Sequence, residues 1–236
     1  MSVPLDSKEI ERFKLALRAY LSLPFSPDLA PEAAEEILAW AVQGTTHAKA
    51  SGMKRSKLLF DVTRGEVGWS LKTFAPSSLQ ADQVFEVVLA RAAVKSDPED
   101  TKTTAPRFTM ESASAQEIGD RALEIRRSVL VKSVQAQDVS DLREAFLLRH
   151  GGNTEFVYFE HPLIVEDPGT VSWRFSDEST RAGIQGSVNG ELRYRWYRSG
   201  GQLFGIFSIP GDETNRFDIE WNEMDWDELI SRILKN

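Results

Sequence analysis

Residues 58–73 read Leu-Leu-Phe-Asp-Val-Thr-Arg-Gly-Glu-Val-Gly-Trp-Ser-Leu-Lys-Thr, and this stretch decides the fold that the sequence predicts. Two strand-like runs, 58–63 and 66–74, flank an Arg-Gly pair, which is typical of a hairpin. Alternate residues of a strand share a face, so Ser70 and Lys72 are expected on the same side of the second strand. The stretch therefore predicts two strands, with a hydroxyl and an ammonium group side by side on one of them.

Two helices are predicted before this hairpin, within residues 1–44. Asp6 and Glu9 form a capping-box pattern, and apolar residues follow at helical spacing. Pro31 suits the first turn of the second helix, which is expected to end at Gly44. The hairpin therefore follows a helical segment rather than opening the fold.

The chain after the hairpin is expected to return to helices and then to change to strands. Ser77 and Gln80 resemble a second capping box and predict a helix over 79–94, and a longer helix is predicted over about 115–134. Strands are predicted over 155–159, 171–175, 191–198, 202–209 and 216–221, with a last helix over 225–234. The strands 191–198 and 202–209 are expected to form a hairpin with Ser199-Gly200-Gly201 as its loop. This order predicts an α/β or α+β fold with a β-rich C-terminal half.

Composition limits the class of protein further. A chain of 236 residues with 41% hydrophobic content predicts one domain with a sizeable core. It has no cysteine, which excludes disulfides, thiolate zinc sites and cysteine nucleophiles. No apolar run is long enough for a membrane span and no signal peptide is apparent, so a cytoplasmic location is expected. The net charge of −8 disfavours a passive coat on nucleic acid but permits an enzyme with a local basic groove.

The hairpin carries residue types that phosphodiester hydrolysis requires. Carboxylates hold a divalent metal, and a cation orients the attacking water or offsets the developing charge. Asp61, expected at the end of the first strand, and Lys72 supply one of each. A second carboxylate is missing at Ser70, where the simplest arrangement would place it.

In these residues the chain resembles the PD-(D/E)XK nuclease superfamily, and within it type II restriction endonucleases whose second acid has moved to the following helix. Ser70-Leu71-Lys72 matches the strand motif of that subgroup, and Glu86 lies fourteen positions beyond the lysine, within the predicted helix. The resemblance implies that Asp61 and Glu86 bind Mg²⁺ and that Lys72 positions the water. Ser70 would leave space for the incoming carboxylate.

Other acids remain open as metal ligands. Glu66 begins the second predicted strand and could replace either acid, and Glu35 or Glu36 could supply a supporting carboxylate from the preceding helix. His47, His150 and His161 are too widely spaced for a metal-ligand pattern, and His161 is expected in a loop.

The resemblance also implies an architecture and partners. It predicts a restriction-endonuclease-like mixed central sheet flanked by helices, in a single domain of N-terminal helices (1–44), a catalytic unit (45–136) and a DNA-recognition half (150–236). The implied partners are duplex DNA, a second copy of the chain if the recognised site is palindromic, and a companion DNA methyltransferase acting on the same site. The alternative is a non-catalytic nuclease-like subunit that binds DNA or protein.

Two groups of cations are candidates for contacts with DNA. One group precedes the hairpin and contains no acid: Lys49, Lys54, Arg55 and Lys57. The other lies on a predicted strand, where Arg193 and Arg195 share a face with Tyr197, and Arg198 follows on the opposite face. Arginines on a β-ribbon can read guanine in the major groove, and the alternative is an exposed face over an aromatic core.

Overall fold

The computed structural model describes residues 5–24, 29–46, 58–96, 108–211, 216–225 and 227–228. The chain divides into two compact units. Unit 1 comprises Met1–Gln83, Lys132–Leu163 and Ile209–Asn236, and unit 2 comprises Val84–Val131 and Ile164–Ser208. Each unit contains a β-sheet and helical residues, so the predicted α+β class is confirmed.

Unit 1 begins with the two predicted helices, α1 (Ser7–Leu21) and α2 (Pro31–Val42). The capping box forms as predicted: the Asp6 carboxylate accepts from the Glu9 amide at 2.8 Å, and the Glu9 carboxylate accepts from the Asp6 amide at 2.9 Å. The helix α2 ends at Gln43, which adopts a left-handed conformation with φ of 55°. Local sequence signals are therefore sufficient to set these two helices.

Sheet A of unit 1 contains the predicted hairpin at its centre. Its strands, in spatial order, are β1 (Thr45–Thr46), β2 (Val62–Arg64), β3 (Val67–Phe74), β5 (Asp141–His150), β6 (Glu155–Pro162) and β11 (Arg216–Asp218). β2 and β3 pair antiparallel around the Arg-Gly turn, β3 and β5 pair in parallel, and the remaining neighbours are antiparallel. The sheet is therefore mixed, as predicted.

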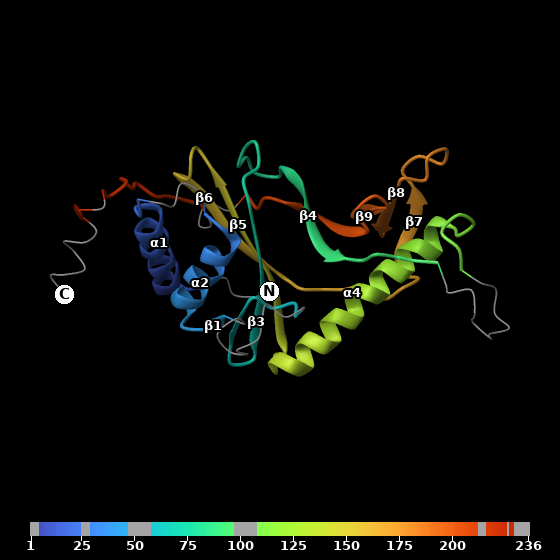
Figure 1. Ribbon diagram of the computed structural model, residues 1–236, viewed down its shortest axis with the longest axis horizontal. Helices are drawn as coiled ribbons and strands as arrows, with labels where there is room; N and C mark the ends of the chain where they lie inside the picture. Colours follow the sequence, from blue (N-terminus) through green and yellow to red (C-terminus); the bar gives the residue numbers. More distant parts are fainter. Residues whose placement is uncertain are drawn as a thin grey trace. The chain divides into compact units, whose positions relative to one another are not determined.

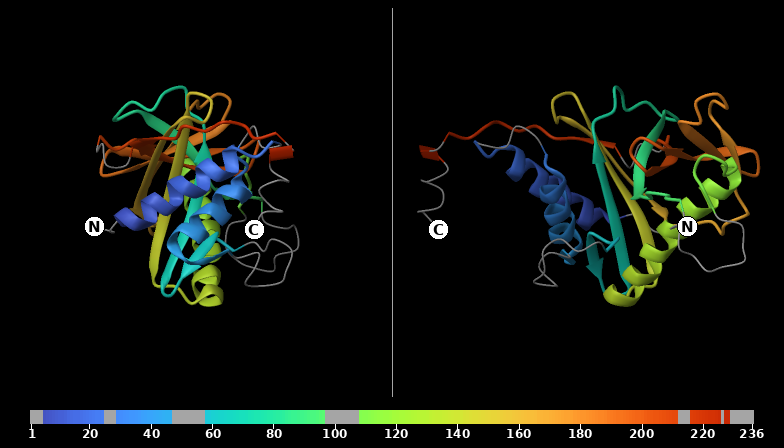
Figure 2. Two further views of the ribbon diagram at one scale, coloured as in Figure 1. Left: turned by 90° about the vertical axis from the view of Figure 1, so that its left-hand side faces the viewer. Right: turned by 45° about the vertical axis from the view of Figure 1, so that its right-hand side comes forward.

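Helices α1 and α2 cover one face of sheet A (Figures 1 and 2). Phe13 of α1 is fully buried, and its ring lies 5.3 Å from that of Tyr158 on β6. The last turns of a third helix, α4 (Ala115–Gln137), also belong to unit 1, where the Gln137 amide donates to the Phe60 carbonyl at 2.8 Å. The contact with Gln137 holds the chain in place at Phe60, at the start of the hairpin segment.

Unit 2 is an antiparallel sheet packed on the first part of α4. Sheet B has the spatial order β4 (Val84–Arg91), β10 (Gln202–Ser208), β9 (Glu191–Tyr197), β8 (Gly183–Val188) and β7 (Ser172–Phe175). Gly119 of α4 lies so close to the Trp173 ring that an added Cβ would be 2.1 Å from it. Glycine at this helical position therefore permits the close packing of α4 on the sheet.

The predicted helix over 79–94 is wrong, because the chain forms β4 there. Phe85, Val87 and Leu89 are buried in alternation, and the strand pairs antiparallel with β10 over its whole length. Phe85 and Leu89 are four residues apart, so the apolar spacing fits a helix as well as a strand. The β-branched content and the pairing with β10 decide for the strand.

Some elements were not predicted, or fall partly outside the described residues. Strands β1, β5 and β8 were not expected, and of the last predicted helix only residues 225 and 227–228 are described. The β9–β10 hairpin is confirmed as an antiparallel pair. Within the described ranges, no helix has the length and apolar character that a membrane crossing requires.

Candidate functional site

Asp61 lies directly before β2, where its backbone and side chain both contact β3. Its amide donates to the Trp69 carbonyl at 2.8 Å, and its carboxylate accepts from the Leu71 amide at 2.7 Å. A backbone donor to one carboxylate oxygen holds the side chain in place. The acid is therefore fixed beside the middle residue of the Ser-Leu-Lys motif.

Ser70 and Lys72 share a face of β3, in agreement with the alternation of the sequence. The Lys72 ammonium donates to the Ser70 hydroxyl at 2.9 Å. Ser70 is fully buried, whereas Lys72 is half-buried. The lysine thus folds back along its own strand, and its charge lies at the level of Ser70, next to the residue that Asp61 contacts.

Two further polar residues lie in the same cross-strand row as Ser70, and the sequence did not single out either for this site. Ser70 is the register partner of Glu144 on β5, and Glu144 is the register partner of His161 on β6. Residues directly opposite one another point to the same face of a sheet. Glu144 is 4% exposed, and His161 lies in a strand rather than in the expected loop.

A sequence signal for Glu144 exists in the strand that carries it. Residues 145–148 form an uninterrupted apolar run between polar neighbours, which is typical of a strand buried on both faces. That signal predicts β5, but not which residue of β3 lies beside Glu144.

Glu86 lies on strand β4 of unit 2, and the helical placement predicted for it is wrong. Its carboxylate forms an ion pair with Arg195 on β9 and accepts from the Tyr197 hydroxyl at 3.3 Å. The subgroup that the chain resembles carries this glutamate on a helix, whereas Glu86 lies on a strand. A role of Glu86 as a metal ligand stays a prediction.

The alternative acids have other surroundings. Glu66 is exposed in the turn between β2 and β3, and its backbone carbonyl accepts from Ser140 and Asp141 amides. Glu36 on α2 accepts from the Thr46 hydroxyl at 2.8 Å, and Glu35 is half-buried on the same helix. Their metal-binding roles likewise stay predictions.

A buried polar network occupies the opposite face of the same strands. The Glu160 carboxylate accepts from Arg143 at 3.0 Å, from Trp69 at 3.1 Å and from the Tyr158 hydroxyl at 2.6 Å. Burial, together with the charge of Glu160, raises the pKa of Tyr158 well above its usual value. Hydrogen bonds from Arg143 lower the pKa of Asp141. This network stabilises the strands that carry the candidate site.

The cations proposed for DNA contacts are only partly described. Lys49, Lys54, Arg55 and Lys57 lie outside the described residues. Arg193 and Arg195 share one face of β9 with Tyr197, whose ring lies 5.2 Å from that of Phe204 on β10.

The three arginines proposed for DNA contacts lie within the described residues, and each is paired with an acid. Arg193 pairs with Glu191, Arg195 with Glu86, and Arg198, in the turn after β9, with Glu111. Such partly exposed pairs are weak, so the arginines could exchange an acid for a phosphate.

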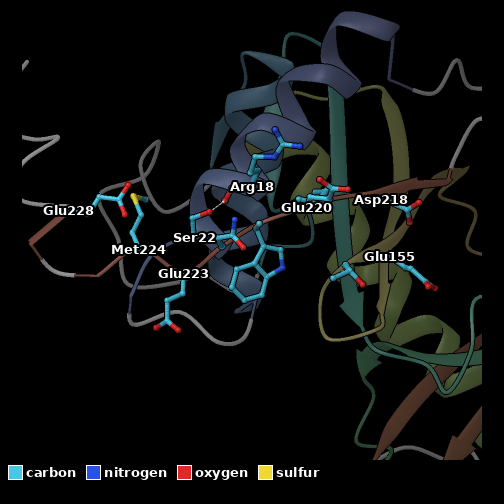
Figure 3. Close-up of a pocket in the computed structure, with 12 residues that line it drawn as sticks. Arg18, Ser22, Glu155, Asp218, Glu220, Glu223, Met224 and Glu228 are labelled. Atoms are coloured by element: carbon cyan, nitrogen blue, oxygen red, sulfur yellow. Dashed lines mark hydrogen bonds between the residues drawn. The ribbon is translucent and has the colours of Figure 1, made fainter.

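An acidic pocket lies elsewhere in unit 1, beside α1 and the chain after β11 (Figure 3). Its lining includes one arginine, Arg18, and five acids: Glu155, Asp218, Glu220, Glu223 and Glu228. A surface with this charge repels the phosphate backbone. We therefore do not expect DNA to bind there.

The donor set at Asp61 is compatible with magnesium. Across the described ranges, no three or more His, Asp or Glu side chains are grouped so that they could hold a metal ion. Magnesium, however, is usually bound by one or two carboxylates together with waters and substrate phosphates. A site built on Asp61 and one further acid would therefore suffice.

No model of a known protein family matches the chain, and no curated protein or solved structure matches it either.

Proposed function

We propose that the protein is a Mg²⁺-dependent endodeoxyribonuclease of the type II restriction kind, which cleaves duplex DNA at specific sequences. The observation that carries this proposal is the convergence of Asp61 and Lys72 on one segment of β3. The Asp61 carboxylate contacts the Leu71 amide, and the Lys72 ammonium contacts the adjacent Ser70 hydroxyl. A fixed acid and a cation that contact adjacent residues of one strand are the residue types that phosphodiester hydrolysis requires.

In this proposal each residue has a separate task. Asp61 would hold the metal ion, which supplies Lewis-acid stabilisation of the phosphate when bound. Lys72 would orient the attacking water and offset the charge that develops on the scissile phosphate. Ser70 would hold the Lys72 ammonium in position through its hydroxyl.

Substrate contacts are proposed for the cations on the chain before β2 and on the outer face of sheet B. Arg193 and Arg195 lie on a strand face that also carries the Tyr197 and Phe204 rings. Arginine offers bidentate donors to guanine and to phosphate. We propose that this face contributes to sequence recognition.

A second copy of the chain is the proposed protein partner, because a palindromic DNA site matches a two-fold dimer. An apolar pocket lies between α1 and α2. Two large apolar residues in its lining, Leu15 and Trp40, are 59% and 51% exposed. Contiguous apolar surface of this kind favours a protein interface. In a restriction system, a methyltransferase acting on the same sites is the further proposed component.

Cleavage of unmethylated phage DNA tests this proposal. Wild-type protein with Mg²⁺ should give discrete fragments, and Lys72→Ala should reduce cleavage about 10²–10⁴-fold. Lys14→Ala is the matched control, because Lys14 pairs with Glu11 on α1 and lies over the Phe217 ring, and it has no role in the proposed site. Cleavage retained by Lys72→Ala would refute the assigned site. Metal-independent DNA binding without cleavage would favour a non-catalytic subunit, which the serine at position 70 also permits.

A further inference from the structure

We infer that Glu144 is the second metal-binding carboxylate of the site, an inference that rests on the proposed nuclease function. The candidate site has one acid at Asp61 and a serine where a second acid would be expected. Glu144 supplies a carboxylate in the cross-strand row of that serine, but from the neighbouring strand β5.

The sheet register places Glu144 on the correct face. Ser70 and Glu144 are direct partners in the parallel β3–β5 pair, and neighbouring strands lie about 4.8 Å apart. The Lys72 ammonium contacts Ser70 and therefore lies at the level of this row. A carboxylate on β5 thus replaces, one strand away, the acid that position 70 lacks.

Glu144 is also buried, which limits the partners that its carboxylate can have. At 4% exposure the carboxylate is almost entirely removed from water, so it needs cations or hydrogen-bond donors as partners, and it already makes such a contact. Lys72 brings one positive charge to the same face, and a bound divalent ion would bring more. The same low-dielectric setting strengthens the hold of a carboxylate on a metal ion.

Glu86 differs from Glu144, because its side chain forms a cross-strand ion pair in sheet B. Arg195 and Tyr197 both contact its carboxylate. A ligand role for Glu86 would require it to exchange these contacts. Glu144 also makes a contact of its own in the fold, but it lies in the cross-strand row of Ser70. Substituting Glu144 and Glu86 one at a time therefore shows which of them binds the metal ion.

Titration of the full chain with Mn²⁺, followed by electron paramagnetic resonance, distinguishes the two glutamates as metal ligands. This measurement does not depend on DNA cleavage. Glu144→Gln should weaken Mn²⁺ binding at least tenfold and abolish DNA cleavage, while Glu86→Gln should leave the Mn²⁺ affinity within about twofold of wild type. Unchanged Mn²⁺ affinity in Glu144→Gln would overturn the inference, as would loss of binding in Glu86→Gln alone.

A second variant covers the case in which Glu144→Gln does not give a cooperative thermal melt. Glu144→Asp keeps the charge and shortens the side chain by one methylene, so it should fold and bind Mn²⁺ more weakly than wild type. Equal affinity would contradict the inference. If wild-type protein binds Mn²⁺ through Glu144 but cleaves no DNA, the nuclease proposal fails and the metal site remains. If it binds no Mn²⁺ at all, the inference itself fails.

Discussion

The two sheets hold their charged side chains in different ways. In sheet A, Glu160 has a side chain that is 1% exposed, and its neighbours Arg143, Tyr158 and Trp69 all donate to it. In sheet B, the Arg193–Glu191 pair is on the surface, with side chains 53% and 71% exposed. Sheet A therefore buries charge between strands and helices, whereas sheet B displays it.

This difference indicates which sheet is expected to carry the reaction and which sheet is expected to bind DNA reversibly. Burying a charge costs several kcal/mol per ion unless its partners compensate, so buried charges have large effects when they are altered. Exposed pairs contribute about 0–1 kcal/mol and are easily exchanged for other partners. We therefore expect the reaction in sheet A and reversible binding at sheet B.

In this comparison of the two sheets, the largest effect is expected from Asp61→Asn. Asparagine keeps an oxygen that can accept from the Leu71 amide, so the fold should persist, but the charge that binds metal is lost. Cleavage should fall by about 10³-fold. The comparison is Asp82→Asn, at an exposed turn with φ of 60° that asparagine tolerates. Equal losses in both variants would show that Asp61 has no special role.

Removal of one partner from the buried network should have the next largest effect. Arg143→Met leaves the Glu160 carboxylate buried without its cation, and we expect a loss of about 3–5 kcal/mol in the free energy of unfolding. Urea unfolding measures this change. Arg193→Ala in sheet B is the counterpart and should cost less than about 1 kcal/mol. Similar values for the two variants would remove the distinction between the sheets.

A pH dependence should follow from Tyr158. Because its pKa is raised above 10.0 in the folded protein, folding favours the neutral hydroxyl. The stabilising contribution is complete below the unfolded value near pH 10 and is lost as the pH rises through the folded pKa. The melting temperature should therefore fall in alkaline solution, and Tyr158→Phe should flatten this dependence. An unchanged alkaline profile in the variant would assign the effect to other groups.

The smallest effect on stability is expected from Glu86→Gln. The ion pair with Arg195 is partly exposed, with side chains 30% and 32% accessible, so its loss should cost about 0–1 kcal/mol. The substitution also frees Arg195 for phosphate, so DNA affinity should rise slightly rather than fall. Filter binding at fixed salt measures the affinity, and a clear decrease would argue against the proposed role of this face.

The sequence predicted the elements whose signals are local. The Asp6–Glu9 capping box, the Arg-Gly hairpin and the Ser199-Gly200-Gly201 turn each lie within a few residues, and all three form. The segment 79–94 was predicted wrongly, because the apolar spacing of Phe85 and Leu89 suits both helix and strand. Only the pairing with β10, more than a hundred residues later, decides between them.

The candidate site was predictable to the same degree. Ser70 and Lys72 are neighbours on one strand, so alternation alone predicts that they share a face. Glu144 comes from a strand far along the chain, and its position depends on a parallel register that no local pattern encodes. The sequence therefore predicts the part of the site that lies on one strand, but not the part that comes from a distant strand.

The most direct test is a crystal of the protein grown with Mn²⁺, in which anomalous scattering locates the ion. The nuclease site proposed for sheet A predicts one peak about 2.1 Å from a carboxylate oxygen of Asp61, with Glu144 as a second ligand. A peak bound by Glu86 and none at Asp61, or no peak at either position, would contradict it.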